Sequence, residues 1–428
     1  MQRISTTDAD FEARFCAILE DGRDTTTRVD AAVSAIIADI RAEGDAALLR
    51  LTARFDGWAP ADTQALRVTT AEIDAALTGV EPGLLAALDL AAARIEAFHR
   101  AQLPTDLALP TTDGVALGMR WNALDAVGLY VPGGKAAYPS SVLMNAIPAR
   151  VAGVARVAMV VPTPGGVLNA LVLAAARRAG VTEIWRIGGA QAVAALAWGT
   201  ASIVPVDRVV GPGNAYVAEA KRQVFGRVGI DSIAGPSEVL ILADAANDAA
   251  HVAMDLLAQA EHDEAAQSIL ITDDASFAGA VAREVEAALM KLPRRAIASE
   301  SWGRHGAIIQ VRDWNEAVGL TNRLAPEHLQ IMTAEPRALF ARIRHAGAAF
   351  LGRHTPEAIG DYVAGPNHVL PTGRTSRFAS GLSVFDFLKR TTWVEADAAG
   401  LAAIGPAAVR LAEAEGLGAH AASVALRL

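Results

Sequence analysis

The chain has 428 residues and a formal net charge of −9 at pH 7, and 52% of its residues are hydrophobic. This length allows two or more domains with sizeable buried cores, and the acidic balance argues against a nucleic-acid-binding surface. The single cysteine, Cys16, excludes an internal disulfide framework and a cysteine-rich zinc site, so any metal must be held by nitrogen and oxygen ligands.

The first residues show no sign of a targeting segment. Asp8, Asp10 and Glu12 precede any long apolar run, so we see no signal peptide. The longest uncharged run, residues 187–206, is interrupted by glycine, serine, threonine and proline, so it is too broken for a membrane span. We therefore expect a cytoplasmic protein.

The first quarter of the chain has mostly helical patterns. Residues 1–25 are typical of a short helical arm, and apolar residues recur at helical spacing from 29 to 55. The sequence Thr69-Thr70-Ala71-Glu72 has the form of a capping box and predicts the start of a helix. A longer helix is expected from residue 82 to 102. Nothing in this region indicates chemistry.

From residue 127 to 225, strand patterns alternate with helical patterns. Buried strands are predicted at 127–131, 157–161, 183–187 and 208–210. Such an array predicts a parallel sheet, whose ligands bind outside the carboxyl ends of the strands. Glycine-rich loops follow two of these strands, in Pro132-Gly133-Gly134 and in Gly211-Pro212-Gly213-Asn214. They could bring backbone N–H groups close to a phosphate, or they could be tight turns only.

A second array follows a break at residues 233–236, where we place a domain boundary. Its strands are predicted at 239–242, 268–271, 307–311 and 348–351. We therefore predict an α/β protein with two Rossmann-like βαβ domains, which are incomplete and related to each other. A helical N-terminal arm and a helical C-terminal tail complete the chain.

Three sets of residues could carry chemistry. Gln259 and His262 are three apart on a predicted helix, so they share a face and could supply two ligands to a divalent metal. Glu327 and His328 place two proton carriers side by side. Asp361 is a plausible hard ligand. Taken singly, each could equally be a solvated polar group or a turn residue. His99 belongs to no such set, so no chemistry is predicted for it.

Taken together, these motifs resemble those of histidinol dehydrogenases. The resemblance runs in unbroken order from about residue 127 to 420, whereas the first hundred residues match only in length and helical character. The segments that carry it are Val131-Pro132-Gly133-Gly134, Tyr138-Pro139-Ser140-Ser141, Gly188-Gly189-Ala190-Gln191, Val210-Gly211-Pro212-Gly213-Asn214, Ala234-Gly235-Pro236-Ser237-Glu238, Leu257-Ala258-Gln259-Ala260-Glu261-His262-Asp263, Ala325-Pro326-Glu327-His328-Leu329, Gly360-Asp361-Tyr362, Gly365-Pro366-Asn367-His368, Ser380-Gly381-Leu382-Ser383-Val384 and Glu415-Gly416-Leu417.

The resemblance implies the four-electron oxidation of L-histidinol to L-histidine through L-histidinal, with two NAD⁺ reduced in succession. These are the last two steps of histidine biosynthesis. It also implies one zinc ion per subunit of a homodimer with a shared active site. The positions that match the zinc ligands are Gln259, His262, Asp361 and, from the other subunit, His420.

The resemblance further implies roles for single residues. Glu327 and His328 match the acid–base pair. The positions that match substrate contacts are Ser237, Gln259, His262, His328, Asp361, His368, Glu415 and His420, and those that match NAD contacts are Tyr130, Gln191 and Asn214. By the same analogy, the domains are an arm (1–25), a zinc and substrate domain (26–129 with 237–381), an NAD-binding domain (130–236) and a tail that reaches the partner subunit (382–428). No membrane partner is implied.

Residue chemistry agrees with these roles and weighs against three alternatives. His328 suits a base that takes the hydroxyl proton, and Glu327 can activate the water that hydrates the aldehyde. A paralogue that oxidises another small alcohol or diol would not need His368 and Glu415, which suit an imidazole-bearing amino-alcohol. A zinc-dependent hydrolase would not need paired βαβ arrays. A non-catalytic nucleotide-binding protein would not need the Glu327-His328 pair. Cys16 lies far from every motif, so a covalent thiohemiacetal is not expected.

Overall fold

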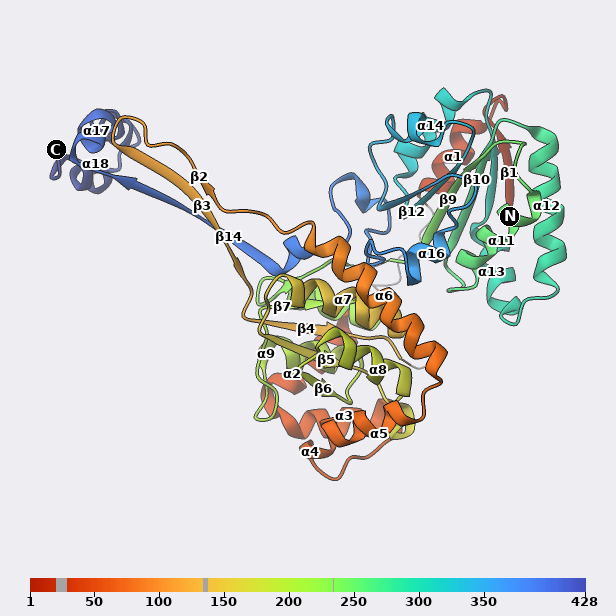
Figure 1. Ribbon diagram of the computed structural model, residues 1–428, viewed down its shortest axis with the longest axis horizontal. Coiled ribbons are helices and arrows are strands. Elements are labelled where there is room, and N and C mark those ends of the chain that lie inside the picture. Colours follow the sequence, from red (N-terminus) through yellow and green to blue (C-terminus); the bar gives the residue numbers. More distant parts are fainter. Residues whose placement is uncertain (21–28, 134–137, 234) are drawn as a thin grey trace.

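The computed structural model of the chain describes residues 1–20, 29–133, 138–233 and 235–428. The structure has two parallel sheets, each covered by helices on both faces, and an antiparallel ribbon that projects away from them (Figure 1). The predicted α/β class with two βαβ arrays is confirmed. Part of the glycine loop predicted at 132–135, and Ala234 at the predicted boundary, lie outside the described residues.

The first sheet has six parallel strands. In spatial order they are β1 (Gln2–Ser5), β11 (Ala307–Gln310), β10 (Gln267–Thr272), β9 (Glu238–Ala243), β12 (His328–Met332) and β13 (Ala348–Leu351). Because side chains alternate along a strand, Leu270 packs on one face, whereas Ile269 and Ile271 pack on the other. The first face is covered by α11 (Ala249–Ala260), α12 (Ala275–Leu289) and α13 (Arg295–His305), and the second by α1 (Phe11–Leu19), α14 (Trp314–Leu324) and α15 (Pro336–Phe340).

The second sheet has five parallel strands. In spatial order they are β6 (Glu183–Trp185), β5 (Arg156–Val160), β4 (Ala126–Tyr130), β7 (Arg208–Val210) and β8 (Gly229–Ile230). One face is covered by α2 (Asp30–Glu43), α3 (Asp45–Phe55), α9 (Gly189–Trp198) and α10 (Ala215–Val224), and the other by α5 (Thr70–Thr78), α6 (Pro82–Arg100), α7 (Pro139–Val151) and α8 (Ala170–Ala179). The capping box predicted at Thr69 and Glu72 is present. The short elements are α4 (Thr63–Leu66), α16 (Glu357–Tyr362) and the 3₁₀ turns η2 (Pro164–Gly166), η3 (Thr375–Arg377) and η4 (Val384–Phe387).

The N-terminal quarter is divided between the two sheets in a way that differs from the expected grouping. Residues 2–5 form an edge strand paired parallel to β11, so the arm predicted as helical begins as a strand. The helices of residues 30–100 pack on the five-stranded sheet, and Val363 and Val369 pack against the same cluster as α6. The helical spacing identified their apolar faces, but spacing does not reveal which sheet a face will cover.

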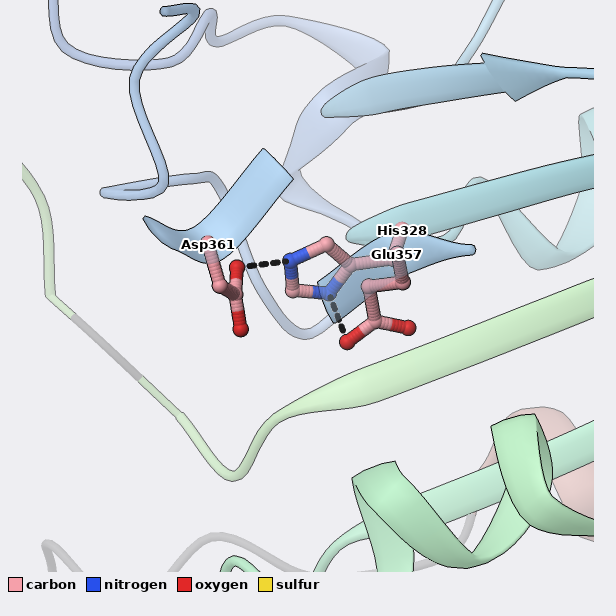
Figure 2. Close-up of side chains that lie close together, drawn as sticks. All are labelled: His328, Glu357 and Asp361. Atoms are coloured by element: carbon pink, nitrogen blue, oxygen red, sulfur yellow. Dashed lines mark ion pairs between the residues drawn. The ribbon is translucent and has the colours of Figure 1, made fainter. Parts of the chain in front are cut away.

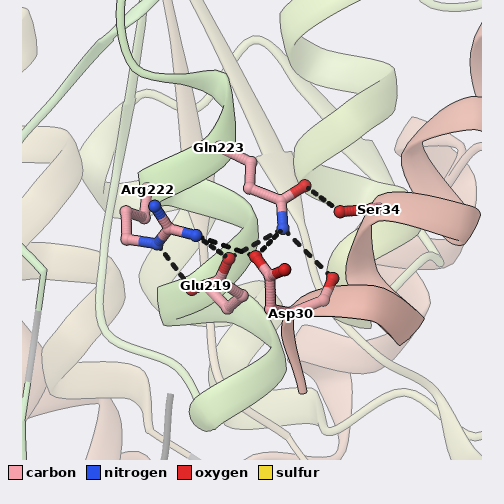
Figure 3. A network of polar contacts seen from close by, with 5 residues as sticks. All are labelled: Asp30, Ser34, Glu219, Arg222 and Gln223. Carbon is pink, nitrogen blue, oxygen red and sulfur yellow. Dashed lines mark hydrogen bonds and ion pairs between the residues drawn. The ribbon is translucent and has the colours of Figure 1, made fainter. Parts of the chain in front are cut away.

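A polar network between α2 and α10 fixes this packing (Figure 3). Arg222 donates to the Asp30 carboxylate over 2.8 Å, and Gln223 donates to the same group over 3.0 Å. Ser34 donates to the Gln223 amide oxygen over 3.0 Å, while the buried Glu219 accepts from both Arg222 and Gln223. The Arg222 guanidinium holds the pKa of Glu219 below its usual value. The start of α2 is therefore held on the five-stranded sheet by paired charges.

An antiparallel ribbon projects from the two sheets and carries the C-terminal helices at its tip (Figure 1). It consists of β14 (Leu388–Ala396), β3 (Val115–Ala123) and β2 (Leu107–Ala108), with α17 (Ala398–Ala414) and α18 (Gly418–Ala425) beyond it. Most residues of β14 are exposed. The tail predicted as helical thus begins with a 3₁₀ turn and a strand. With neither face buried, β14 has no alternating apolar pattern to reveal it.

Within the described ranges, no single helix has both the length and the apolar composition that a membrane span needs. Helices α5 and α6 meet those criteria only as a pair, and they are bent by 119° at their break.

Candidate active site

The site residues gather where the two sheets present opposite edges to each other. His328 begins β12 and Ser237 precedes β9, so both lie at the amino edge of the six-stranded sheet. Tyr130 ends β4 and Gly211 follows β7, so these lie at the carboxyl edge of the five-stranded sheet. We expected ligand-binding residues at the carboxyl ends of the strands. This expectation describes the five-stranded sheet but not the six-stranded sheet. In a βαβ unit the helix returns to the amino edge, and α11 therefore ends there with Gln259.

The backbone of Glu238 holds His328 and Glu327 in place. Its N–H donates to Glu327 Oε2 over 2.8 Å, and its carbonyl oxygen lies 3.0 Å from His328 Nδ1. Because a carbonyl only accepts, Nδ1 must carry a proton. Nε2 has no hydrogen-bond partner among the described residues and lies 3.6 Å from Asp361 Oδ1 (Figure 2). The imidazole therefore presents Nε2 as its available atom.

Three carboxylates surround this imidazole. Glu327 Oε2 and Glu357 Oε1 each lie 3.6 Å from His328 Nδ1. Burial raises the pKa of Glu327 to about 7 and that of Glu357 to about 8. Burial opposes the charged imidazolium, but Glu357, Glu327 and Asp361 outweigh it and raise the pKa of His328 well above its usual value. Burial also opposes the ionised Asp361, yet contact with His328 lowers its pKa. The cluster can therefore accept and release protons near neutral pH.

A set of metal-type donors overlaps this cluster. Gln259 is fully buried, and neither its amide oxygen nor its amide nitrogen has a hydrogen-bond partner among the described residues. His262 lies just beyond the end of α11, and α11 packs against α16, which carries Asp361. The surrounding protein lowers the pKa of the His262 imidazole by desolvation, while the charge of Asp361 acts in the opposite direction. Asp361 is thus close enough to His262 to influence its pKa, and Gln259 lies on a helix that packs against α16.

A second, overlapping donor set contains His328, Glu357 and Asp361. Each of the three can offer one ligand atom, and these atoms lie within 4.8 Å of one another. Asp361 is common to both sets. A metal in this second set would occupy the only nitrogen of His328 that is free to take a proton, so the two sets predict different chemistry for that residue.

His368 joins the two lobes. Its Nδ1 lies 2.9 Å from the Asp361 carbonyl oxygen and therefore donates to it, so Nε2 is left as an acceptor facing Ser141 Oγ at 3.4 Å. Burial lowers its pKa. Ser141 belongs to α7 on the five-stranded sheet. A neutral, oriented imidazole thus lies between the Asp361 segment and the opposite lobe.

The residues expected to contact NAD lie at the carboxyl edge of the five-stranded sheet. The Tyr130 hydroxyl accepts from the Gly189 N–H over 3.0 Å, and burial raises its pKa to about 12. Gln191 is buried on α9, and its amide oxygen has no partner among the described residues. Asn214 caps α10 by accepting from Tyr216 and Val217. At Gly211, any Cβ would lie 2.1 Å from the Tyr130 carbonyl oxygen, so only glycine fits this turn.

Glu415 and His420 are not near these groups within the same chain. Glu415 follows α17 and His420 lies on α18, at the tip of the projecting ribbon, and both are exposed. Figure 1 shows these helices far from β12 and α16. Within one chain, α18, which carries His420, therefore lies apart from α16, which carries Asp361.

Some site residues were not predicted from the sequence. Glu357 is four residues before Asp361, a spacing that places both on one face of a helix, so this signal was available. Gln330 and Ser141 gave no such signal. Gln330 donates to Asp255 over 2.6 Å and accepts from the Glu357 N–H over 3.3 Å, and it sits there only because β12 pairs with β9.

The two parallel α/β lobes face each other, and a buried histidine, carboxylates and metal-type donors lie between them. This arrangement defines an enzyme of the α/β class. A sequence model of the histidinol dehydrogenase family matches residues 19–428. A histidinol dehydrogenase of Gluconobacter oxydans is 63% identical over 429 residues, covering 100% of this chain and 99% of that protein. One of Rhodospirillum rubrum is 61% identical over 427 residues, covering 100% and 98%.

The solved structures agree with this match. The crystal structure of histidinol dehydrogenase from Elizabethkingia anophelis superposes with a TM-score of 0.93 at 35% identity, covering 100% of this chain and 98% of that one. The chain belongs to the histidinol dehydrogenase family.

We expect that replacing Gln259 by methionine raises the melting temperature of EDTA-treated protein. Its amide is buried without a partner among the described residues, and such a group costs about 1–3 kcal/mol. The matched control is Gln330→Met, whose amide is hydrogen-bonded at both ends and whose loss should lower the melting temperature. Differential scanning fluorimetry measures both. A fall for Gln259→Met would show that its amide is satisfied without metal.

Proposed function

We propose that this chain oxidises L-histidinol to L-histidine through L-histidinal, reducing two NAD⁺. The observation that carries the proposal is the buried His328, whose Nε2 is free of hydrogen bonds among the described residues and whose neighbour Glu327 is held beside it by one backbone residue. Membership in the family supplies the substrate.

We further propose that zinc is held by Gln259, His262 and Asp361, with His420 of the partner subunit as the fourth ligand. The donor set fits zinc, because a carboxylate, an imidazole and a buried, unpartnered amide supply oxygen and nitrogen ligands. This set is preferred over His328, Glu357 and Asp361 because it leaves His328 free to act as a base. When bound, the zinc would orient the substrate and only secondarily polarise it.

In the first oxidation, the neutral form of His328 takes the hydroxyl proton of L-histidinol at Nε2 while the carbinol hydride passes to NAD⁺. The products are L-histidinal, NADH and a proton on the imidazole. The contact of Nδ1 with the Glu238 carbonyl keeps the ring in the tautomer that this step needs. Glu357 and Asp361 stabilise the resulting imidazolium.

In the second oxidation, water adds to the aldehyde and the hydrate gives its hydride to a second NAD⁺. Glu327 takes a proton from the attacking water, since its pKa of about 7 suits a base at neutral pH. The aldehyde oxygen takes the proton that His328 gained in the first oxidation, which completes the hydrate and returns the imidazole to its neutral form. The hydrate then gives a hydroxyl proton to His328 as the hydride leaves, and the resulting carboxylic acid loses its proton to give the carboxylate of L-histidine.

The remaining contacts follow from the positions of the side chains. Ser237 precedes β9, the strand that pairs with the His328 strand, and His368 contacts the Asp361 backbone. Both would orient the substrate, with Glu415 of the partner subunit completing the contacts. Tyr130, Gln191 and Asn214 border the carboxyl edge of the five-stranded sheet and would receive NAD⁺. The opposed edges then bring the reacting carbon and the nicotinamide together.

We expect purified protein supplied with zinc, excess NAD⁺ and limiting L-histidinol to form two NADH per substrate consumed. Absorbance at the NADH band measures the ratio. A ratio of one would mean that the second oxidation does not occur here. No NADH above background would reject the substrate.

We expect His328→Asn to lower kcat by at least about 100-fold, because the asparagine amide can still donate to Glu238 but offers no base at the Nε2 position. Zinc content, measured by atomic absorption, should stay near that of the unaltered protein. The control is His354→Asn, an exposed histidine, which should behave like the unaltered protein. Loss of zinc from His328→Asn would instead support His328, Glu357 and Asp361 as the ligands.

We expect that His262→Ala and His420→Ala proteins, each inactive alone, regain activity when mixed under subunit exchange. A mixed dimer would have one intact site, so random exchange would restore up to about one quarter of the unaltered activity. The control mixes His262→Ala with Asp361→Ala, which alter the same half of the site and should restore nothing. Equal activity in both mixtures, or in neither, would contradict a site shared between subunits.

A further inference from the structure

The segment that carries His368 is held by a helix of the opposite lobe. After α16, the chain crosses to α6 on the five-stranded sheet, where Arg94 Nε donates to the Val363 carbonyl over 2.7 Å. Arg94 Nη2 also donates to the Ala364 carbonyl over 3.2 Å. The beginning of this segment is thus tied to α6 by a single guanidinium group.

A second tie lies one turn further along α6, between His99 and Asn367. His99 Nδ1 lies 2.7 Å from the Ile95 carbonyl oxygen and must donate to it, so Nε2 is an acceptor. Asn367 Nδ2 lies 3.4 Å from that Nε2 and 2.6 Å from the Met144 carbonyl oxygen. The amide nitrogen of Asn367 has two hydrogens, and each of these acceptors can take one. His99 is completely buried, and Asn367 is 7% exposed.

His99 is an unexpected residue at its position. It continues the buried stripe of α6 formed by Leu88, Ala91 and Ile95, where a leucine would avoid the cost of burying an imidazole. Burial lowers the pKa of His99. A polar group in this stripe stabilises the protein only through the partners that it finds. For His99 these are the backbone of Ile95 and of Leu382, together with the Asn367 side chain.

Asn367 fixes the backbone on both sides of its own position. Its Oδ1 accepts from the Val369 N–H over 2.9 Å, which closes a turn around His368. Its Nδ2 reaches α7, the helix that also supplies Ser141 to the His368 imidazole. The imidazole of His368 is therefore oriented by Asp361 on the side of β12, and by Ser141 and the turn at Asn367 on the side of the opposite lobe.

We propose that His99 and Asn367 are positioning residues that set the orientation of His368, and with it the placement of the substrate relative to the cofactor lobe. His99 touches no reacting group, so it acts only through Asn367. The kinetic consequence of this inference rests on the proposed function. The ordering of residues 363–372 follows from the contacts alone.

The test replaces His99 by leucine, which fills the same space and removes the acceptor. The expected result is a fall in kcat/KM for L-histidinol of at least about tenfold, since a small misplacement of a positioning group can cost that much. The KM for NAD⁺ should change less than about twofold. His99→Gln, whose amide oxygen can accept from Asn367, should recover most of the loss. If His99→Leu does not fold, Asn367→Ala is measured in the same way and should show the same pattern.

Hydrogen–deuterium exchange of residues 363–372 gives a readout independent of activity. Exchange should be faster in His99→Leu than in the unaltered protein. Leu88→Ala, on the same buried stripe about three turns before His99, should lower the melting temperature and leave both exchange and kinetics unchanged. Unaltered kinetics and exchange in His99→Leu, or equal acceleration in Leu88→Ala, would overturn the proposal. If the unaltered protein does not oxidise L-histidinol, the proposed function fails, and exchange still decides the role of His99.

Discussion

One backbone residue, Glu238, holds both members of the proposed acid–base pair, and the site depends on that arrangement. Its N–H stabilises the buried Glu327 carboxylate, and its carbonyl fixes the ring of His328. Carboxylates and an imidazole buried without such partners would strongly destabilise the fold. Because β9 and β12 pair in parallel with His328 opposite Val239, the position of Glu238 is set by the sheet itself. The pair is therefore held by rigid strands rather than by loops.

The second constraint is that the two sheets face each other with opposite edges. The five-stranded sheet presents strand ends and helix starts, where the N–H of Gly189 donates to the Tyr130 hydroxyl. The six-stranded sheet presents strand starts and the end of α11, where Gln259 and His262 lie. Each edge offers a different kind of group. The five-stranded lobe suits the binding of a dinucleotide, and the six-stranded lobe carries the metal donors and the proton carriers. The segment around Asn367 ties the two edges together.

The sequence was sufficient for features that depend on neighbouring residues. The capping box at Thr69 and most strands of both arrays follow from local spacing, whereas α11 ends at Ala260, before His262. The features that the sequence did not reveal depend on contacts between residues that are far apart in the chain. The helices of residues 30–100 have clear apolar faces, yet nothing in those faces shows which sheet they cover.

Two further elements had no local signal. β12 follows Pro326 and contains His328 and Gln330, so its polar residues hid a fully buried strand. β14 is exposed along most of its length, so it lacks the alternation that marks a half-buried strand. His99 was given no role because a histidine in an apolar stripe has no pattern of its own. Its partner Asn367 is 268 residues away.

The length of the projecting ribbon has a thermodynamic consequence. β14 pairs with β3 over its nine residues, which at about 3.4 Å each carry the chain roughly 30 Å outward. In the proposed assembly, the last zinc ligand arrives only with a second chain. Zinc binding and chain association are then linked equilibria, and each must strengthen the other by the same free energy. Diluting the protein would weaken its hold on zinc, and a chelator would loosen the pair of chains. In that assembly, the zinc concentration and the protein concentration would each change how much of the same site is occupied.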